Sequence, residues 1–158
     1  MSGSSNPSRF KIDNEAQFFA DFPNLKASQF RVTSPPTPAS SFPNVYNCFA
    51  YTIGKRQWWW PTDYGRWPAD CASGDILESF VLAYKKFGFR PCADGSPERG
   101  KDKIAVYMMG EAVKHVAIQL RSRPGIWRSK CGLNVDIEHS LNALEGGIYG
   151  FVTEFFSR

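Results

Sequence analysis

The stretch Lys103-Ile104-Ala105-Val106-Tyr107-Met108 decides the expected fold, because it begins a series of apolar runs with the composition of β-strands. A second run covers residues 116–120, directly after His115, and a third covers residues 126–130. Only short turn segments separate the three runs. We therefore expect an antiparallel meander, which a closing strand at 149–155 completes.

Helices are expected mainly before this sheet. Asn14 and Gln17 have the spacing of a capping box for a short helix. A mostly apolar helical face extends from about Asp75 to Phe87, and residues 136–144 again have helical spacing. Residues 30–47 contain four prolines and are expected to be irregular or extended. Helices followed by an antiparallel sheet predict the α+β class.

Composition favours a single globular domain. The chain has 158 residues, of which 42% are hydrophobic and 22% charged, enough to bury a core without metal or disulfide support. We expect a flexible leader at residues 1–12 and one domain at 13–158. The net charge of +4 is spread along the chain without a Lys/Arg tract, so nothing points strongly to nucleic acid.

The four cysteines form neither CxxC pairs nor a zinc pattern, so we expect no metal and no other cofactor. We interpret them as reduced thiols of a protein made in the cytosol, with a disulfide framework as the alternative. Residues 1–9 are polar and lack the apolar region of a signal peptide. No apolar stretch is long enough to span a membrane.

The motif Asn47-Cys48-Phe49-Ala50-Tyr51 provides the candidate nucleophile. A turn-forming segment precedes Cys48 and a short apolar run follows it to Gly54, so the thiol is expected at the start of a short helix. Backbone N–H groups there favour a thiolate. His115, expected at the start of a strand, is the candidate general base. The alternatives are a buried structural cysteine and a surface histidine.

A third residue should orient the base, and the sequence leaves it open. Ser129 fits the meander best, whereas Asp136 or Glu138 would stabilise an imidazolium better. His139 is expected to have a structural role at the start of the last helix.

The oxyanion and the substrate need further groups. The backbone N–H of Cys48 is one donor for an oxyanion, and a side chain could supply a second; the candidates are Asn44, Asn47 and Gln29. The aromatic run Trp58, Trp59 and Trp60 cannot face inward at all three positions. It therefore indicates either a substrate groove wall or packing beneath the proline-rich segment.

Several of these motifs occur together in one order, which resembles a known pattern. The motifs are Asn47–Tyr51, Trp58–Pro61, His115–Ala117, Ser129–Gly132, Asp136–His139 and Tyr149–Gly150. The series resembles an uncharacterised, toxin-associated bacterial family with a small papain-like domain, related to cell-wall-hydrolase-like cysteine peptidases and amidases. The resemblance covers roughly residues 20–158.

The resemblance implies a papain-like fold in which the helix that begins at Cys48 packs on the C-terminal antiparallel sheet. It implies that Cys48 is the nucleophile and His115 the base, and that Ser129, Lys130 and His139 belong to the shared scaffold or site. A cysteine at position 131, where the family usually has a larger hydrophobic residue, points to the core.

The expected function is that of a cysteine hydrolase acting on an amide or acyl bond, as a peptidase, an amidase or a glutamine deamidase. Its substrate would be a protein, a peptide or peptidoglycan. The toxin association implies a secreted antibacterial or host-directed effector, made in the cytoplasm and delivered by a specialised secretion system, with a cognate immunity protein as a partner. The alternative is a non-catalytic binding module that uses the aromatic groove.

Overall fold

The computed structural model describes residues 10–36, 47–55, 67, 74 and 76–158. This part of the chain forms short helices and seven strands. The order is α1 (Glu15–Asp21), β1 (Phe30–Ser34), α2 (Cys48–Thr52), α3 (Leu77–Lys86), β2 (Arg90–Cys92), β3 (Lys103–Met109), β4 (Ala112–Gln119), β5 (Trp127–Lys130), β6 (Asp136–His139), the 3-10 helix η2 (Leu141–Leu144) and β7 (Phe151–Ser157).

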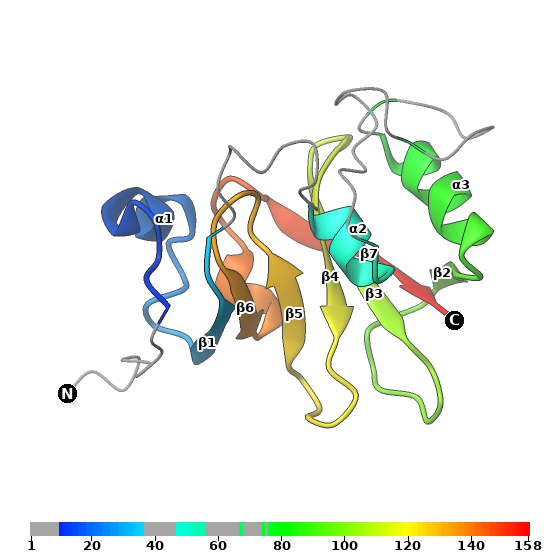
Figure 1. Cartoon of the computed structure of the whole chain (residues 1–158). Coiled ribbons are helices and arrows are strands. Elements are labelled where there is room, and N and C mark those ends of the chain that lie inside the picture. Colours follow the sequence, from blue (N-terminus) through cyan, green and yellow to red (C-terminus); the bar gives the residue numbers. More distant parts are fainter. Residues whose placement is uncertain (1–9, 37–46, 56–66, 68–73, 75) are drawn as a thin grey trace.

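All seven strands belong to one antiparallel sheet with the order β1-β6-β5-β4-β3-β7-β2. Strands β3 to β6 are neighbours in chain order, so the antiparallel meander expected from the sequence is confirmed. Figure 1 shows α1 beside the β1 end of the sheet and α3 near the β2 end, with α2 in front of the central strands. The helix α2 packs against β4 and β5.

The expected α+β, papain-like fold, with N-terminal helices packed on a C-terminal sheet, is wrong. The sheet dominates the described residues, and its strands come from the whole length of the chain: β1 precedes α2, and β2 precedes the meander. The helices have only 7, 5 and 10 residues. None of the described helices combines the length and the apolar character that a bilayer crossing requires.

The prediction of a helix at 136–144 is also wrong. Residues 136–139 form β6, and only 141–144 are helical, as the short η2. A tight turn precedes β6, in which the amide of Cys131 donates to the carbonyl of Val135 at 3.2 Å. The alternation of polar and apolar residues in Asp-Ile-Glu-His has the period of a strand, and two neighbouring strands satisfy its backbone groups.

Three expectations for the N-terminal region need similar correction. Residues 30–34, placed in the irregular proline-rich segment, form β1, because the prolines begin only at Pro35 and leave these amides free to pair with β6. Asn14 precedes α1 in a left-handed conformation and makes no side-chain capping bond. In the expected leader, Phe10 and Ile12 pack against the core.

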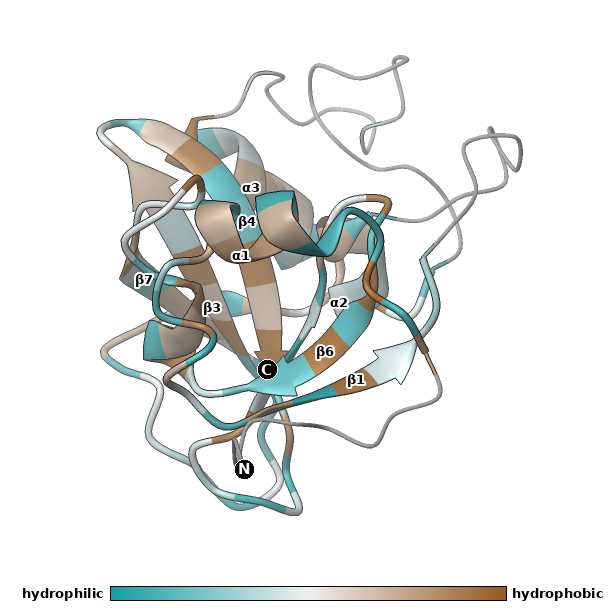
Figure 2. Cartoon of the chain, turned by 90° about the vertical axis from the view of Figure 1, so that its left-hand side faces the viewer, coloured by the Kyte–Doolittle hydropathy of each residue, from teal (hydrophilic) through white to brown (hydrophobic). Residues whose placement is uncertain are grey.

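Hydrophobic residues cover both sides of the sheet, and β3 shows why. Its alternate residues belong to two different buried clusters: Ala105 and Tyr107 face the one that includes α1, whereas Ile104 and Val106 face the one that includes α2 and α3. Figure 2 shows hydrophobic bands along the strands, with α1 lying across them. The polar side chains that share this interior are therefore exceptional, and several of them form the candidate site.

Candidate active site

Cys48 begins α2, as the sequence predicted. Asn47 precedes the helix with an extended backbone, and its side-chain oxygen accepts a hydrogen bond from the amide of Ala50 at 3.0 Å. At the other end, Gly54 has a φ of 71°, a conformation that suits glycine. The helix is pinned by the pair of Thr52 and Tyr84, whose hydroxyl oxygens are 2.6 Å apart.

The thiol of Cys48 is protonated at neutral pH, contrary to the thiolate expected from its helix position. Burial is the main cause and raises the pKa of Cys48 to about 12, although the sulfur accepts hydrogen bonds from the amides of Val116, Phe49 and Cys48 itself, which lower the pKa. Only 7% of the residue's surface is exposed. Desolvation thus outweighs the helix start, and the thiol needs a base when it reacts.

His115 lies within β4, opposite Tyr107 on β3, and not at a strand start. Its ring is fully buried. One face stacks on Tyr149, with ring centroids 4.0 Å apart and an angle of 3° between the planes. The Nε2 atom of His115 lies 2.8 Å from Oγ of Ser129 on β5. Packing on one side and a hydrogen bond at one end therefore fix the orientation of the imidazole.

The hydrogen bonds continue from Ser129 to His139 and define the tautomer of both rings. A carbonyl oxygen only accepts, so Nδ1 of His139 donates to the carbonyl of Ser140 at 2.7 Å. In a neutral imidazole the Nε2 atom is then an acceptor, and the Ser129 hydroxyl donates to it at 2.7 Å. The Ser129 oxygen in turn accepts from Nε2–H of His115. Because the single hydrogen of the neutral His115 ring is on Nε2, its Nδ1 carries no hydrogen.

Both imidazoles are neutral because they are buried. Burial lowers the pKa of His139 to about 4, while its bond to the Ser140 carbonyl raises it. Burial, followed by the nearby His139, holds the pKa of His115 well below its ordinary value. The Nδ1 atom of His115 is a buried acceptor that has no hydrogen-bond partner among the described residues. A bare, desolvated imidazole nitrogen can accept a proton from a reacting group.

Cys48 and His115 belong to opposite sides of β4: Cys48 packs with Val116 in the cluster that includes α2 and α3, whereas His115, stacked on Tyr149, faces the cluster that includes α1. The sulfur of Cys48 accepts a hydrogen bond from the Val116 amide, which is one peptide bond away from His115. The helix that carries the thiol packs on β4, where the histidine lies, and on β5, where Ser129 lies. The described residues show no hydrogen bond between the thiol and the imidazole.

Tyr149 was not predicted as a site residue, yet it supports the imidazole. Its backbone lies between close contacts: a Cβ on Gly147 would collide with the carbonyl of Asp21, and one on Gly150 with the carbonyl of Met108. Gly150 also has a φ of 70°. The clustered glycines around Tyr149 were the available sequence signal, because such close approach requires residues without a side chain.

The two carboxylates proposed to orient the base point elsewhere. Asp136 and Glu138 lie on the opposite side of β6 from His139, because side chains alternate along a strand. Asp136 pairs with Lys130 at 3.7 Å. Glu138 pairs with arginines at 3.2 and 3.6 Å, namely Arg123 and Arg128. Ser129 is therefore the residue that contacts the base directly, and His139 is a partner of that serine.

The remaining predicted residues contribute less to this geometry. Asn44 and the run Trp58–Trp60 lie outside the described residues, so the aromatic groove has no structural description. Gln29 is exposed just before β1. The side-chain oxygen of Asn47 serves the helix cap, and its buried Nδ2 atom has no hydrogen-bond partner among the described residues. That amide is the oxyanion candidate nearest in sequence to the thiol.

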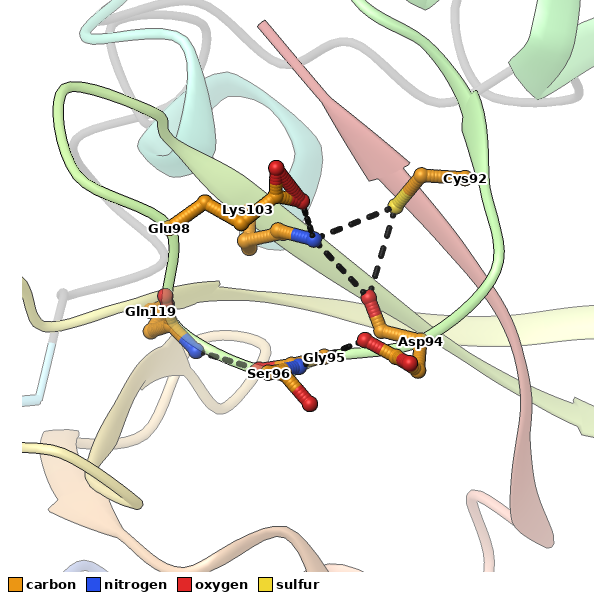
Figure 3. A network of polar contacts seen from close by, with 7 residues as sticks. All are labelled: Cys92, Asp94, Gly95, Ser96, Glu98, Lys103 and Gln119. Carbon is orange, nitrogen blue, oxygen red and sulfur yellow. Dashed lines mark hydrogen bonds and ion pairs between the residues drawn. The ribbon is translucent and has the colours of Figure 1, made fainter.

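A second polar network surrounds Lys103, whose side chain is 1% exposed (Figure 3). Its ammonium group donates to Glu98 at 2.6 Å, to the carbonyl of Asp94 at 3.2 Å and to the sulfur of Cys92 at 3.8 Å. These bonds fasten the loop after β2 to β3. Cys92 is partly exposed, unlike Cys48 and Cys131, which are buried. A reagent that labels thiols is therefore expected to reach Cys92 more easily than Cys48 or Cys131.

Within the described ranges, no three His, Cys, Asp or Glu side chains are grouped so that they could hold a metal ion. The chemistry open to the site is that of a thiol, an imidazole and a hydroxyl in a dry environment.

Comparison with known proteins places the chain in a family. It belongs to the family described as Domain of unknown function (DUF7689), which matches residues 32–157. The matched region contains the thiol, both imidazoles and the serine, and it excludes α1. No curated protein and no solved structure matches the chain.

Proposed function

We propose that the protein is a cysteine hydrolase that acts on an amide or related acyl bond, with Cys48 as the nucleophile and His115 as the base. One observation carries the proposal. Hydrogen bonds run from the Ser140 carbonyl through His139 and Ser129 to Nε2 of His115, and they leave Nδ1 of His115 as a bare acceptor. The residue next to His115 in the strand is Val116, whose amide binds the sulfur of Cys48, although the His115 ring itself faces the other side of β4.

The reaction begins with a neutral thiol and a neutral imidazole. The thiol and the imidazole face opposite sides of β4, so the reaction requires a local rearrangement that brings them together. As the sulfur then attacks the carbonyl carbon of the substrate, an S–C bond forms and the thiol proton moves to Nδ1 of His115. His115 returns this proton to the leaving amine, which leaves a thioester on Cys48. A water molecule then attacks the thioester, His115 takes a proton from that water, and the proton returns to the thiol. Because burial raises the pKa of Cys48, proton removal and attack are coupled.

The oxyanion that develops on the substrate requires hydrogen-bond donors near the sulfur. The amides of Cys48, Phe49 and Val116 already point to the sulfur. The unpartnered Nδ2 atom of Asn47 is a further donor at the same end of α2. We assign the oxyanion site to this group, with the backbone amides as its principal members.

Peptide bonds, peptidoglycan stem amides and protein glutamine side chains are the substrates that this chemistry covers. The resemblance to toxin-associated domains supports an effector role, with delivery by a specialised secretion system and inhibition by a cognate immunity protein. These parts of the proposal rest on analogy.

Thiol alkylation tests the nucleophile without knowledge of the substrate. Cys92→Ser removes a partly exposed thiol, and Cys71→Ser removes the cysteine outside the described residues, so that only Cys48 and Cys131 can react with iodoacetamide. In this background we expect Cys48 to be alkylated at least about tenfold faster than Cys131, a difference equivalent to about 1.4 kcal/mol in activation free energy. Cys131 is an internal control, because burial also raises the pKa of its thiol.

His115→Ala should bring the alkylation rate of Cys48 down to that of Cys131, while circular dichroism confirms that the variant is folded. Equal, slow labelling of Cys48 and Cys131 in the parent protein would contradict the proposal. The rates are measured by mass spectrometry of peptides after timed quenching.

Growth of a host that expresses the protein tests hydrolysis of a cellular target. We expect growth inhibition by the parent protein in either the cytosolic or the periplasmic form. Cys48→Ala and His115→Ala should each abolish the inhibition, whereas Cys92→Ser should not. Inhibition that persists in the Cys48→Ala variant would show that the effect is not thiol chemistry.

A further inference from the structure

A hollow opens between the start of α3 and the hairpin that joins β3 to β4. Its volume is about 520 Å³, and its lining includes Ile76, Leu77 and Met108. A β-bridge between Ile76 and Ala112 holds the start of α3 against the start of β4. Leu77 and Met108 are half-buried and pack against the cluster that includes α2 and α3. The floor of the hollow is therefore an extension of the hydrophobic core.

Three carboxylates line the same hollow. Glu78 lies in the first turn of α3, Glu111 in the hairpin between β3 and β4, and Glu154 on β7. Glu154 lies opposite Val106, which faces the cluster that includes α2 and α3, so both side chains are on the α3 side of the sheet. All three glutamates are exposed, and no ion pair among the described residues includes them. Their charges are therefore not compensated within the described part of the chain.

The sign of this charge indicates what the hollow complements. The chain as a whole has a net charge of +4, whereas the described residues that line the hollow include acids and no lysine or arginine. Within the described ranges, no three acidic, histidine or cysteine side chains are grouped so that they could hold a metal ion. The complementary group is therefore an organic cation, such as an ammonium or a guanidinium group.

Exposed apolar surface continues beyond the hollow. Phe151 on β7 lies opposite Met108 on β3, so the two side chains point to the same side of the sheet. Phe151 is 59% exposed and Ile76 is 44% exposed. Large exposed apolar side chains beside a hollow are typical of surfaces at which another protein docks. A small cation would fill the hollow and leave Phe151 uncovered, whereas a segment of a protein covers both.

We propose that this hollow is a docking site for a segment of a partner protein that presents a lysine or an arginine next to an apolar side chain. The aliphatic stem of the basic residue lies on the apolar floor, and its charged head group reaches the carboxylates. The neighbouring apolar side chain packs on Phe151. The inference involves neither the thiol nor the imidazoles, so it is independent of the proposed function.

Capped tripeptides of matched shape serve as probes: Leu-Arg-Leu, the same peptide with neutral citrulline in place of arginine, and Leu-Glu-Leu. NMR of the full chain with labelled isoleucine, leucine and methionine methyl groups follows binding. At low salt we expect Leu-Arg-Leu to shift the signals of Ile76, Leu77 and Met108 and to bind about tenfold more tightly than the citrulline peptide, with Leu-Glu-Leu the weakest. Sodium chloride at about 0.5 M should remove most of this difference. Equal affinity of the arginine and citrulline peptides, or shifts confined to other methyl groups, would overturn the proposal.

Glu78→Gln and Glu15→Gln form a matched pair. Each glutamate is exposed in the first turn of a helix, and each substitution removes one negative charge. Of the two, only Glu78 lines the hollow. Glu78→Gln should therefore weaken Leu-Arg-Leu binding about threefold, as should Glu111→Gln and Glu154→Gln, whereas Glu15→Gln should not change it. Equal effects of the matched pair would mean that the peptide responds to the overall charge and would refute the site.

Phe151→Ser distinguishes a protein segment from other occupants. It should weaken Leu-Arg-Leu about threefold or more and leave the binding of capped Gly-Arg-Gly unchanged, because only the first peptide has an apolar side chain to pack on Phe151. If argininamide binds as tightly as Leu-Arg-Leu, the hollow is a site for a small cation and the docking proposal fails. Sedimentation of the parent protein provides the last test. Self-association that Glu78→Gln abolishes would assign the hollow to a second copy of this chain and would likewise overturn the proposal.

Discussion

The imidazole of His115 lies flat against the phenol ring of Tyr149, with the planes inclined by 3° and the centroids 4.0 Å apart. Among the described residues, several neighbouring aromatic rings instead meet at steep angles. A parallel contact holds the imidazole in one plane, so that the hydrogen bond to Ser129 determines its remaining freedom. The stacking therefore decides where the bare nitrogen of the base points.

Replacement of Tyr149 should affect the base according to whether a ring remains. Tyr149→Leu removes the stacked ring, and we expect it to cost about 1 kcal/mol of stability from the lost contact and to slow alkylation of Cys48. Tyr149→Phe keeps the ring and should preserve alkylation. Urea unfolding and the alkylation rate are the two measurements. Equal alkylation rates in the two variants would show that the ring does not position His115.

Stability should fall when the protein is acidified. The pKa of His139 is about 4 in the folded protein and has its ordinary value of 6.5 in the unfolded chain, so between these values the unfolded chain binds a proton that the folded chain excludes. The contribution of His139 to the free energy of unfolding is fully present above pH 6.5. It is lost as pH falls towards about 4, which lowers the stability by roughly 3 kcal/mol. His115 acts in the same direction.

Urea unfolding at a series of pH values measures this decline. His139→Gln removes one of the two buried imidazoles that resist protonation in this window, so the stability of the variant should depend less on pH than that of the parent protein. An identical pH dependence in both would mean that His139 is not held neutral by burial.

Alkaline conditions should destabilise the protein for the opposite reason. The pKa of Cys48 rises from 9.0 to about 12 on folding, so above pH 9.0 the unfolded chain loses a proton that the folded chain retains. Stability should therefore fall as pH rises through this range, by about 4 kcal/mol from Cys48 by the end of it. Cys48→Ala should reduce the slope, as should Cys131→Ala, whose thiol pKa is also raised by burial. Unfolding curves collected above pH 9.0 provide the test.

The glycine after Tyr149 should not tolerate a side chain. At Gly150 the φ of 70° disfavours an L-residue, and a Cβ would also collide with the carbonyl of Met108. Gly110 has a similar φ of 61°, but a Cβ there would meet no atom within 4 Å, so Gly110→Ala isolates the conformational cost of about 1–2 kcal/mol. Gly150→Ala should cost more. Thermal unfolding of the two variants compares them, and equal losses would mean that the collision is relieved cheaply.

Local sequence patterns predicted the elements whose signals are local. The asparagine cap and Gly54 mark the two ends of α2, and the apolar runs mark β3, β4 and β5. The pKa of Cys48 could not be derived in this way. The helix start is visible in the sequence, but the burial that outweighs it depends on which strands cover the thiol.

His139 was predicted as a supporting residue, but its hydrogen bond to Ser129 could not be predicted, because its segment was assigned to a helix. In that arrangement the histidine would lie one turn from the helix start, far from Ser129. In the strand β6 it lies opposite Trp127 and on the same side as Ser129, so the serine reaches its ring. The pairing of β6 with β1 and β5 supplies this information, and a single segment read alone cannot.

Ser129 and His139 are both carried by the hairpin that joins β5 to β6. A strand alternates its side chains, so one residue inserted in the connecting turn at 132–134 would rotate β6 by half a period. Glu138 would then be directed inward in place of the imidazole, and a carboxylate would meet the serine. The length of one short turn thus determines whether the interior of this protein holds a neutral imidazole or a fixed negative charge.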